Sequence, residues 1–403
     1  SGANQPALTS NMIPVYYDSA SDSWKKADSD NADKSSQWYD YDNKMWANAV
    51  TVSETNRQTY LSAKTGTTIP MSDINTMWVW VPRYTYTYLN TNTPQEINVK
   101  FESGTASTGT IKCTDNVTGT SSTSETCTDT TNNGLKAGTS TYTHPAFTFG
   151  DQELTGIWVG KFEISSGQII KPNVTSLRSQ TVNQLYTGIY NMRNSGNAFG
   201  FSTTDETHMM KNMEWGAVTY LSHSKYGINK EIAINSANTY TTGCGPQSEG
   251  STSSGATCNG YTTALGQSAS TTGNTSGVYD MSGGAYEYVM GNMVNSSGAF
   301  YSSNAGFSTA PDAKYYDKYS YDASSNTTYT RGKLGDATKE MAPTGTSGNW
   351  YSDYAYFPYS SSPWFFRGGL YGDGACAGAF LFYFSNGSAF SSFSSRAVLG
   401  VLD

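Results

Sequence analysis

Five cysteines carry the clearest covalent chemistry in this sequence. The spacing from Cys113 to Cys127 equals that from Cys244 to Cys258, and both intervals are polar loops rich in Ser, Thr and Gly. Closing a loop of this length with a disulfide removes entropy from the unfolded chain and stabilises the fold by about 3 kcal/mol. We therefore predict two local disulfides, which fit an oxidising compartment, and an unpaired Cys376. Four unpaired surface thiols are the alternative.

Metal binding or catalysis would need spacings that this chain does not offer. The sequence has no Cys-x-x-Cys pair and only three histidines, which are His144, His208 and His223. Residues 208–227 are expected to form one helix, which would hold His208 and His223 roughly 22 Å apart along its axis. Neither a Gly-x-Ser-x-Gly nor a His-Glu-x-x-His motif occurs. We predict a protein that is not an enzyme and uses no metal or other cofactor.

The C-terminal stretch has an unusual composition. From Phe365 to the end it contains no Lys, Met, Gln, Glu or Trp, although the rest of the chain uses all five. Within it, the strand-like run at residues 377–384 would place Phe380, Phe382 and Phe384 on one face. Leu381 and Tyr383 would lie on the other face, and large apolar side chains exposed there would mark a binding surface. A strand buried on both faces is the alternative.

The overall composition restricts the class of protein. Charged residues make up 14% of the 403 residues, aromatic residues another 14% with 30 tyrosines, and the net charge is −8. A disordered chain would carry more net charge and fewer aromatic residues, and a nucleic-acid-binding chain would show clusters of Lys and Arg. No stretch is apolar enough over sufficient length to span a membrane. This composition is typical of an extracellular protein rich in strands and loops.

Short strands and few helices must position these residues. Residues 1–70 are rich in Trp and Tyr, and we expect them to form a small β-rich segment packed on residues 71–403. In the latter, residues 182–192 carry apolar side chains at helical spacing, after a capping box made by Thr181 and Gln184. Together with the helix expected further along, this predicts an α+β fold.

Five segments resemble, in order, the motifs of the formylglycine-generating-enzyme family. They are "GIWVGKFEIS" (156–165), "MEWGAVTYLSH" (213–223), "SGVYDMSGGAYEYVMGNM" (276–293), "FRGGLY" (366–371) and "SSRAVLGV" (394–401). The resemblance covers roughly residues 154–403 and implies the C-type-lectin-like fold of this family. The enzymes hold copper with a pair of cysteines near the C-terminal part of the domain, where this chain has only Cys376. Glu287, Arg367 and Arg396 are expected to be structural, held in ion pairs beneath a loop.

The ending also resembles the variable proteins of diversity-generating retroelements. In these systems the adenines of a template repeat are copied unfaithfully, and AAC and AAT codons are the usual targets. Codons changed only at those two adenines cannot encode Lys, Met, Gln, Glu or Trp. Residues 365–394 therefore resemble a diversified region set in an invariant frame, with chance as the alternative.

This resemblance implies a surface-displayed ligand-binding protein, similar to a receptor or adhesin, whose C-terminal side chains are diversified on a constant scaffold. It would work outside the cell, on a bacterial surface or pilus or on a phage particle. Its partner would be a protein or a glycan, and not a nucleic acid. The positions expected to bind ligand are Phe366, Leu370, Tyr371, Asp373, Cys376, Leu381, Tyr383, Ser385, Asn386, Ser388, Phe390, Ser392 and Phe393.

Two other functions remain open at this stage. Exposed Trp and Tyr side chains could stack on sugars, as in a carbohydrate-binding lectin, although no cluster of Asp, Asn and Glu near the ending suggests a calcium site. Low charge and an abundance of Tyr, Ser and Thr also fit a structural pilin or fibre subunit.

Overall fold

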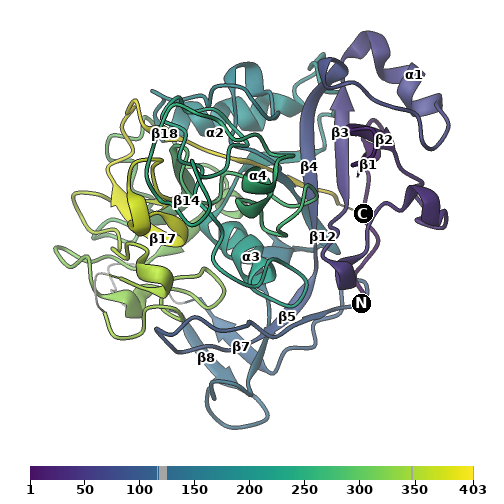
Figure 1. Cartoon of the computed structure of the whole chain (residues 1–403). Helices are drawn as coiled ribbons and strands as arrows, with labels where there is room; N and C mark the ends of the chain where they lie inside the picture. The colour runs from purple at the N-terminus through teal and green to yellow at the C-terminus, as the bar shows by residue number, and fades with distance from the viewer. Residues whose placement is uncertain (116, 118–124, 346–347, 403) are drawn as a thin grey trace.

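The computed structural model describes residues 1–115, 117, 125–345 and 348–402. Two sheets stand at opposite sides of the molecule, and short helices and long loops fill the space between them (Figure 1). The described part of the chain is thus a mixture of helix and sheet in which strands predominate, in agreement with the predicted α+β class.

The larger sheet is antiparallel and combines strands from both ends of the chain. Its strands, in spatial order, are β13 (Glu206–Met209), β19 (Ala397–Gly400), β12 (Gly156–Gly160), β4 (Ile74–Pro82), β3 (Asn48–Val52), β1 (Ile13–Asp18) and β2 (Ser23–Lys26). The three strands within residues 1–70 therefore continue the sheet of the following residues. At the other side, β19 lies between β12 and β13 although it comes last in the sequence.

Both faces of the larger sheet are covered, which explains its nearly continuous apolar strands. Every residue of β3, β12, β13 and β19 is buried. On one face lies the start of the chain, where the indole N–H groups of Trp80 and Trp158 donate to the carbonyl oxygens of Asn4 (3.1 Å) and Ala7 (2.6 Å).

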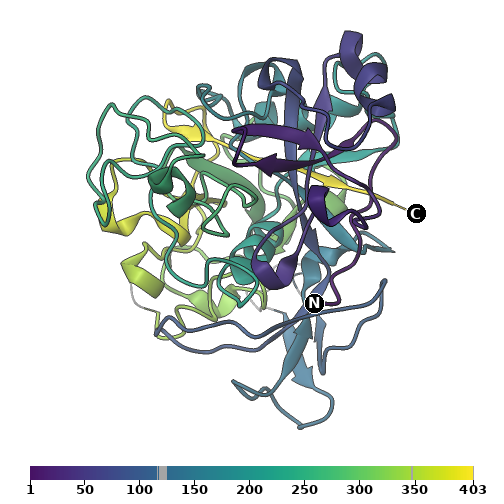
Figure 2. The ribbon, with the colours of Figure 1, turned by 45° about the vertical axis from the view of Figure 1, so that its right-hand side comes forward.

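The smaller sheet contains the C-terminal stretch. Its strands, in spatial order, are β15 (Asp317–Tyr319), β14 (Tyr286–Met293), β16 (Trp364–Gly368) and β17 (Gly378–Ser385), and the short β18 (Phe393–Ser394) pairs in parallel with β14. This sheet lies on the side of the molecule away from both chain ends (Figure 2). The last described strand, β19, returns from it to the larger sheet.

Three further pairings complete the strands. They are β6 (Val99–Phe101), β5 (Tyr84–Thr87) and β9 (Thr141–Thr143) in one sheet, the hairpin β7 (Ile111–Thr114) and β8 (Thr126–Asp129), and the pair β10 (Thr148–Phe149) and β11 (Gln152–Glu153). The β7–β8 hairpin projects from the body of the molecule (Figure 1).

The helices are α1 (Arg57–Ser62), α2 (Val182–Tyr190), α3 (Asn212–Ser222) and α4 (Ala264–Ser268). Helix α2 has the predicted capping box, in which the Thr181 hydroxyl accepts from Gln184 N–H and the Gln184 side chain accepts from Thr181 N–H. The expected start of the second helix was wrong, because His208 belongs to strand β13 and α3 begins only at Asn212. No helix in the described part of the chain has the length and apolar run needed to cross a bilayer.

Candidate ligand-binding face

A cluster of aromatic rings covers the outer side of strands β16 and β17. Phe366 and Tyr383 are cross-strand partners, and their rings stack with centroids 5.1 Å apart and an interplanar angle of 27°. The ring of Phe393 lies 4.9 Å from that of Phe366, and Tyr286 lies 4.7 Å from Phe366 and 5.0 Å from Phe393. Phe390 contacts Phe393 at 5.3 Å. We call these five residues the aromatic face.

The aromatic face is layered from the core outwards. Phe366 and Phe393 form its base and are 6% and 8% exposed. Tyr383 and Tyr286 are half-buried above them, and Phe390 is the outermost ring, with 41% of its surface exposed. Four of the predicted variable residues are therefore brought together in one surface, but only the outer rings present a broad area to solvent.

A turn at residues 369–377 adds polar groups beside the rings. The Tyr286 hydroxyl donates to the carboxylate of Asp373 at 3.1 Å, and the other carboxylate oxygen of Asp373 accepts from the N–H of Leu370 at 3.0 Å. Tyr371 N–H donates to the carbonyl oxygen of Gly284 at 2.9 Å. Burial raises the pKa of the Asp373 carboxyl. Leu370, Tyr371 and Asp373 are half-exposed in this turn.

Leu381 is buried, contrary to the exposure expected from strand alternation. It does lie on the side of β17 opposite Phe380 and Phe382, but the turn folds back over it: a side chain added at Gly369 would meet Leu381 at 3.2 Å and Ala377 at 2.7 Å. Phe384, which was expected on the same face as Phe380 and Phe382, is half-exposed at the end of the strand.

The predicted serines and Asn386 lie at the margin of the aromatic face. The Tyr288 hydroxyl is 2.8 Å from the hydroxyl of Ser385 and donates to the carbonyl oxygen of Ser388 at 2.9 Å. Asn386 accepts through its side chain from Ser388 N–H, which shapes the loop itself. Ser392 accepts through its carbonyl oxygen from Tyr286 N–H. Their contacts support the loop, and Ser385 is buried.

Arg367 fixes the backbone under these side chains. Its buried guanidinium donates to the carbonyl oxygens of Leu381 (2.6 Å), Asp336 (2.8 Å) and Ala337 (3.1 Å) and to the side chain of Asn212 (2.7 Å). Arg367 therefore joins β16 to β17 and to α3 through hydrogen bonds, rather than through the ion pair expected for it.

Arg396 makes the ion pair that was predicted for this part of the chain. Its guanidinium donates to both carboxylate oxygens of Glu287 at 3.0 Å, and to the carbonyl oxygens of Gly160 (2.9 Å) and Tyr279 (2.8 Å). Burial raises the pKa of the Glu287 carboxyl, and the guanidinium acts in the opposite direction. Because Glu287 points inwards, the rings on either side of it in β14 point to the aromatic face, as alternation predicts.

Three tyrosines outside the C-terminal stretch belong to the same surface and were not predicted. Tyr354 and Tyr356 contact the ring of Tyr383 at 5.9 and 4.9 Å, and Tyr240 contacts Tyr371 at 5.0 Å. Tyr354 is 38% exposed. The alternation of aromatic residues in "YAYFPY" (354–359) is a signal that could have revealed the first two.

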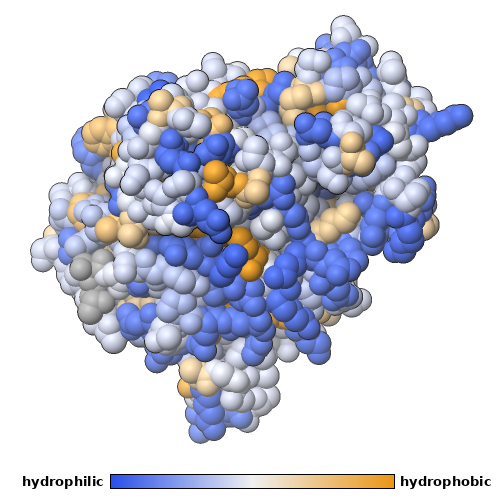
Figure 3. Space-filling view, viewed as in Figure 1, coloured by the Kyte–Doolittle hydropathy of each residue, from blue (hydrophilic) through white to orange (hydrophobic). Residues whose placement is uncertain are grey.

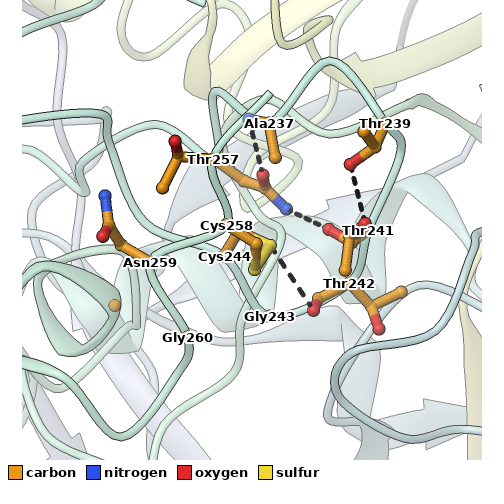
Figure 4. The surroundings of a disulfide bond; sticks show 12 residues. Ala237, Thr239, Thr241, Thr242, Gly243, Cys244, Thr257, Cys258, Asn259 and Gly260 are labelled. Atoms are coloured by element: carbon orange, nitrogen blue, oxygen red, sulfur yellow. Dashed lines mark hydrogen bonds between the residues drawn. A yellow bond between two sulfur atoms is a disulfide. The ribbon is translucent and has the colours of Figure 1, made fainter. Parts of the chain in front are cut away.

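Both predicted disulfides are formed. Cys113 and Cys127 are cross-strand partners in the β7–β8 hairpin. The bond between Cys244 and Cys258 closes a loop that otherwise has little secondary structure (Figure 4). Cys376 is unpaired and half-exposed beside the aromatic face.

The histidines lie apart and are engaged with neighbouring groups. His208 contacts the Glu214 carboxylate at 2.7 Å, His144 contacts the Gly335 carbonyl oxygen at 2.8 Å, and His223 lies 2.6 Å from the hydroxyl of Tyr351. Within the described residues, one group of His, Cys, Asp or Glu side chains is close enough to share an ion: Glu125 with Cys113 and Cys127. Since that cysteine pair is a disulfide, its sulfur atoms are not free thiolates.

No family model matches the chain. No curated protein matches it either. Its structural neighbours are variants of the Major Tropism Determinant. The P3c variant is 12% identical, with a TM-score of 0.29 over 98% of this chain and 74% of that chain. The U1 variant is 11% identical, with a TM-score of 0.30, and the match covers 100% of this chain and 96% of that chain. The M1 variant is also 11% identical, with a TM-score of 0.30, and the match covers 96% of this chain and 95% of that chain.

Proposed function

We propose that this chain is a surface-displayed ligand-binding protein whose C-terminal side chains are diversified by a retroelement on a constant scaffold. The observation that carries the proposal is the separation of roles along residues 365–403. Arg367 and Arg396 are buried and donate to backbone carbonyl oxygens, whereas Tyr383 is half-buried and Phe390 is 41% exposed in the aromatic face.

Physical considerations favour binding as the role of this surface. Large, rigid aromatic side chains supply contact area at low cost in conformational entropy, and a preorganised backbone lowers the cost of association. The proposed ligand-binding positions are Phe366, Leu370, Tyr371, Asp373, Cys376, Tyr383, Phe390 and Phe393, with Ser385, Asn386, Ser388 and Ser392 at their margin; Leu381 would act only by supporting the turn above it.

The finer description of the domain is also a proposal. The motif at residues 276–293 favours a C-type-lectin-like domain of the formylglycine-generating-enzyme type. We infer a binding role and no catalysis, because the enzymes of this family hold copper with a pair of cysteines in the C-terminal part of the domain. This chain has only Cys376 there. The two disulfides support a location outside the reducing cytosol, on a cell surface or a particle.

A library made with NNC and NNT codons tests the proposal. The codons would be placed at Leu370, Tyr371, Asp373, Tyr383 and Phe390, and the variants displayed and selected against a panel of purified proteins and immobilised glycans. Most variants should keep the melting temperature of the parent, and selection should yield binders with different specificities. A matched library at buried positions of β12 should yield mainly unfolded chains.

Two results would overturn the proposal. One is general loss of folding in the first library, which would show that the outer side chains are part of the core. The other is a well-folded library from which no binder to any protein or glycan emerges.

A further inference from the structure

A cavity of about 730 Å³ opens beside the turn at residues 369–377. Gly374 and Ala377, which lie on either side of Cys376 in the sequence, line the cavity at this turn. Ile232 and Ile234 line its floor together with Leu265 of α4. The volume lies in the range of pockets that hold small ligands or several side chains of a partner. Near α4, Figure 3 shows small hydrophobic areas within a largely hydrophilic surface.

The opposite wall is the loop closed by the Cys244–Cys258 disulfide, which supplies residues 246–252 to the lining. Inside the loop, the Gln247 side chain donates to the carbonyl oxygen of Thr257 at 2.7 Å. The Asn235 side chain donates to the carbonyl oxygen of Thr241 at 3.0 Å, and Figure 4 shows Thr241 and Thr242 close to the disulfide. A polar loop of this kind has few apolar contacts to hold it, so the covalent bond and these hydrogen bonds keep the wall in place.

The wall reaches the variable turn. A side chain added at Gly374 would lie 3.9 Å from the hydroxyl oxygen of Thr252, at the far end of the disulfide loop. The cavity therefore adjoins the turn at residues 369–377, and Asp373 of this turn accepts a hydrogen bond from Tyr286 of the aromatic face.

The lining combines an apolar floor with an acidic rim. Ile232 and Ile234 are 5% and 4% exposed. Glu231 and Glu249 stand at the mouth, opposed by a single cation, Lys230, and all three are exposed. This arrangement complements a ligand with an aliphatic group next to a positive charge.

We propose that this cavity is a constant subsite of the binding surface, which takes an extended peptide segment of a protein ligand carrying an aliphatic residue next to Lys or Arg. The proposal rests on the proposed function, because the variable turn lines part of the cavity. The constant subsite supplies affinity that does not depend on the diversified residues, and the aromatic face then selects among ligands.

A displayed library of random peptides, selected against the whole disulfide-bonded protein, tests the subsite. Peptides with an aliphatic residue next to a basic one should be enriched. Their affinity should fall at least tenfold for Ala264→Trp, because Ala264 is exposed and lines the cavity. The matched control is Ala256→Trp, which places the same ring on an exposed part of the disulfide loop outside the lining and should leave affinity unchanged.

Neutralising the two carboxylates tests the contribution of the acidic rim to binding separately from that of the apolar floor. The double variant Glu231→Gln and Glu249→Gln should weaken the selected peptides several-fold and remove their dependence on salt. Glu54→Gln, an exposed carboxylate far from the lining, serves as its control.

A double variant of the aromatic face, compared with Ala264→Trp, distinguishes the subsite proposal from the proposed function. If Tyr383→Asn with Phe390→Asn abolishes peptide binding while Ala264→Trp has no effect, the aromatic face binds and the subsite proposal is wrong. If Ala264→Trp abolishes binding and the face variant does not, the subsite stands without the proposed role of the face. Failure to enrich any aliphatic–basic peptide would also overturn the subsite.

Discussion

The two main sheets of the molecule differ in how completely their side chains are buried. In the larger sheet both faces are covered, and β12 and β19 have no residue exposed to solvent. In the smaller sheet, Phe380 and Phe382 of β17 are buried, while Tyr383 and Phe384 at its end are half-exposed. The central strands of the larger sheet are thus buried on both faces, whereas the end of β17 remains partly accessible, and the proposed function assigns the changeable side chains to this accessible side.

The largest effects should come from truncating the buried face of either sheet. Phe382→Ala and Trp158→Ala should each lower the free energy of unfolding by about 3–5 kcal/mol, because each leaves a cavity among buried side chains. Denaturant unfolding monitored by fluorescence measures both. A cost below about 1 kcal/mol for Phe382→Ala would show that the smaller sheet has no true core face.

Loss of the Cys244–Cys258 disulfide should have the next largest effect. Replacing both cysteines by Ser should cost about 3 kcal/mol, because the unfolded chain regains the entropy of an open loop. Thermal unfolding of the double variant is compared with that of Cys376→Ser, which should lie within about 0.5 kcal/mol of the parent. A disulfide joining Cys376 to another cysteine, found by peptide mapping without reduction, would contradict the comparison.

Stability should fall as pH rises through neutrality. Burial, together with the carboxylates of Glu287 and Asp280, raises the pKa of Glu163 well above its ordinary value. The folded state therefore retains a proton that the unfolded state releases near pH 4.5, so stability is greatest in mild acid and is lost as pH rises. Glu163→Gln should reduce the fall in melting temperature between about pH 5 and pH 8. The exposed Glu54→Gln should leave that fall unchanged, and an equal slope in both variants would be evidence against Glu163.

The smallest effects should come from the outer face. Tyr371→Asn, Tyr383→Asn and Phe390→Asn should each change the free energy of unfolding by about 0.5 kcal/mol or less. Phe366→Asn should cost clearly more, because Phe366 forms the base of the ring cluster. Equal losses at Tyr383 and Phe382 would erase the distinction between the two faces of β17.

Local chemistry made several features predictable from the sequence. Equal spacing in polar loops identified both disulfides. The Thr181–Gln184 capping box fixed the start of α2, since it uses side chains close in sequence. The ion pair expected for Glu287 and Arg396 is formed.

Long-range packing decided what the sequence could not reveal. Leu381 alternates correctly, yet the turn that buries it is set by contacts at Gly369 and Ala377. His208 was expected at the start of a helix over residues 208–227, but it pairs with β19 and therefore belongs to strand β13. Tyr354 and Tyr356 show local alternation, but their contacts with Tyr383 depend on the path of the loop that carries them.

The place of strand β19 makes folding depend on the reading frame of the residues that precede it. It follows residues 365–394 in the sequence and lies inside the larger sheet, between β12 and the edge strand β13. A frameshift within residues 365–394 would remove β19 together with Arg396, so β13 would lose its pairing with the sheet, β12 would keep only its pairing with β4, and Glu287 would lose its ion pair. Under the proposed function, a copying error of that kind is eliminated by failure to fold, while a change of side chain passes into the mature protein.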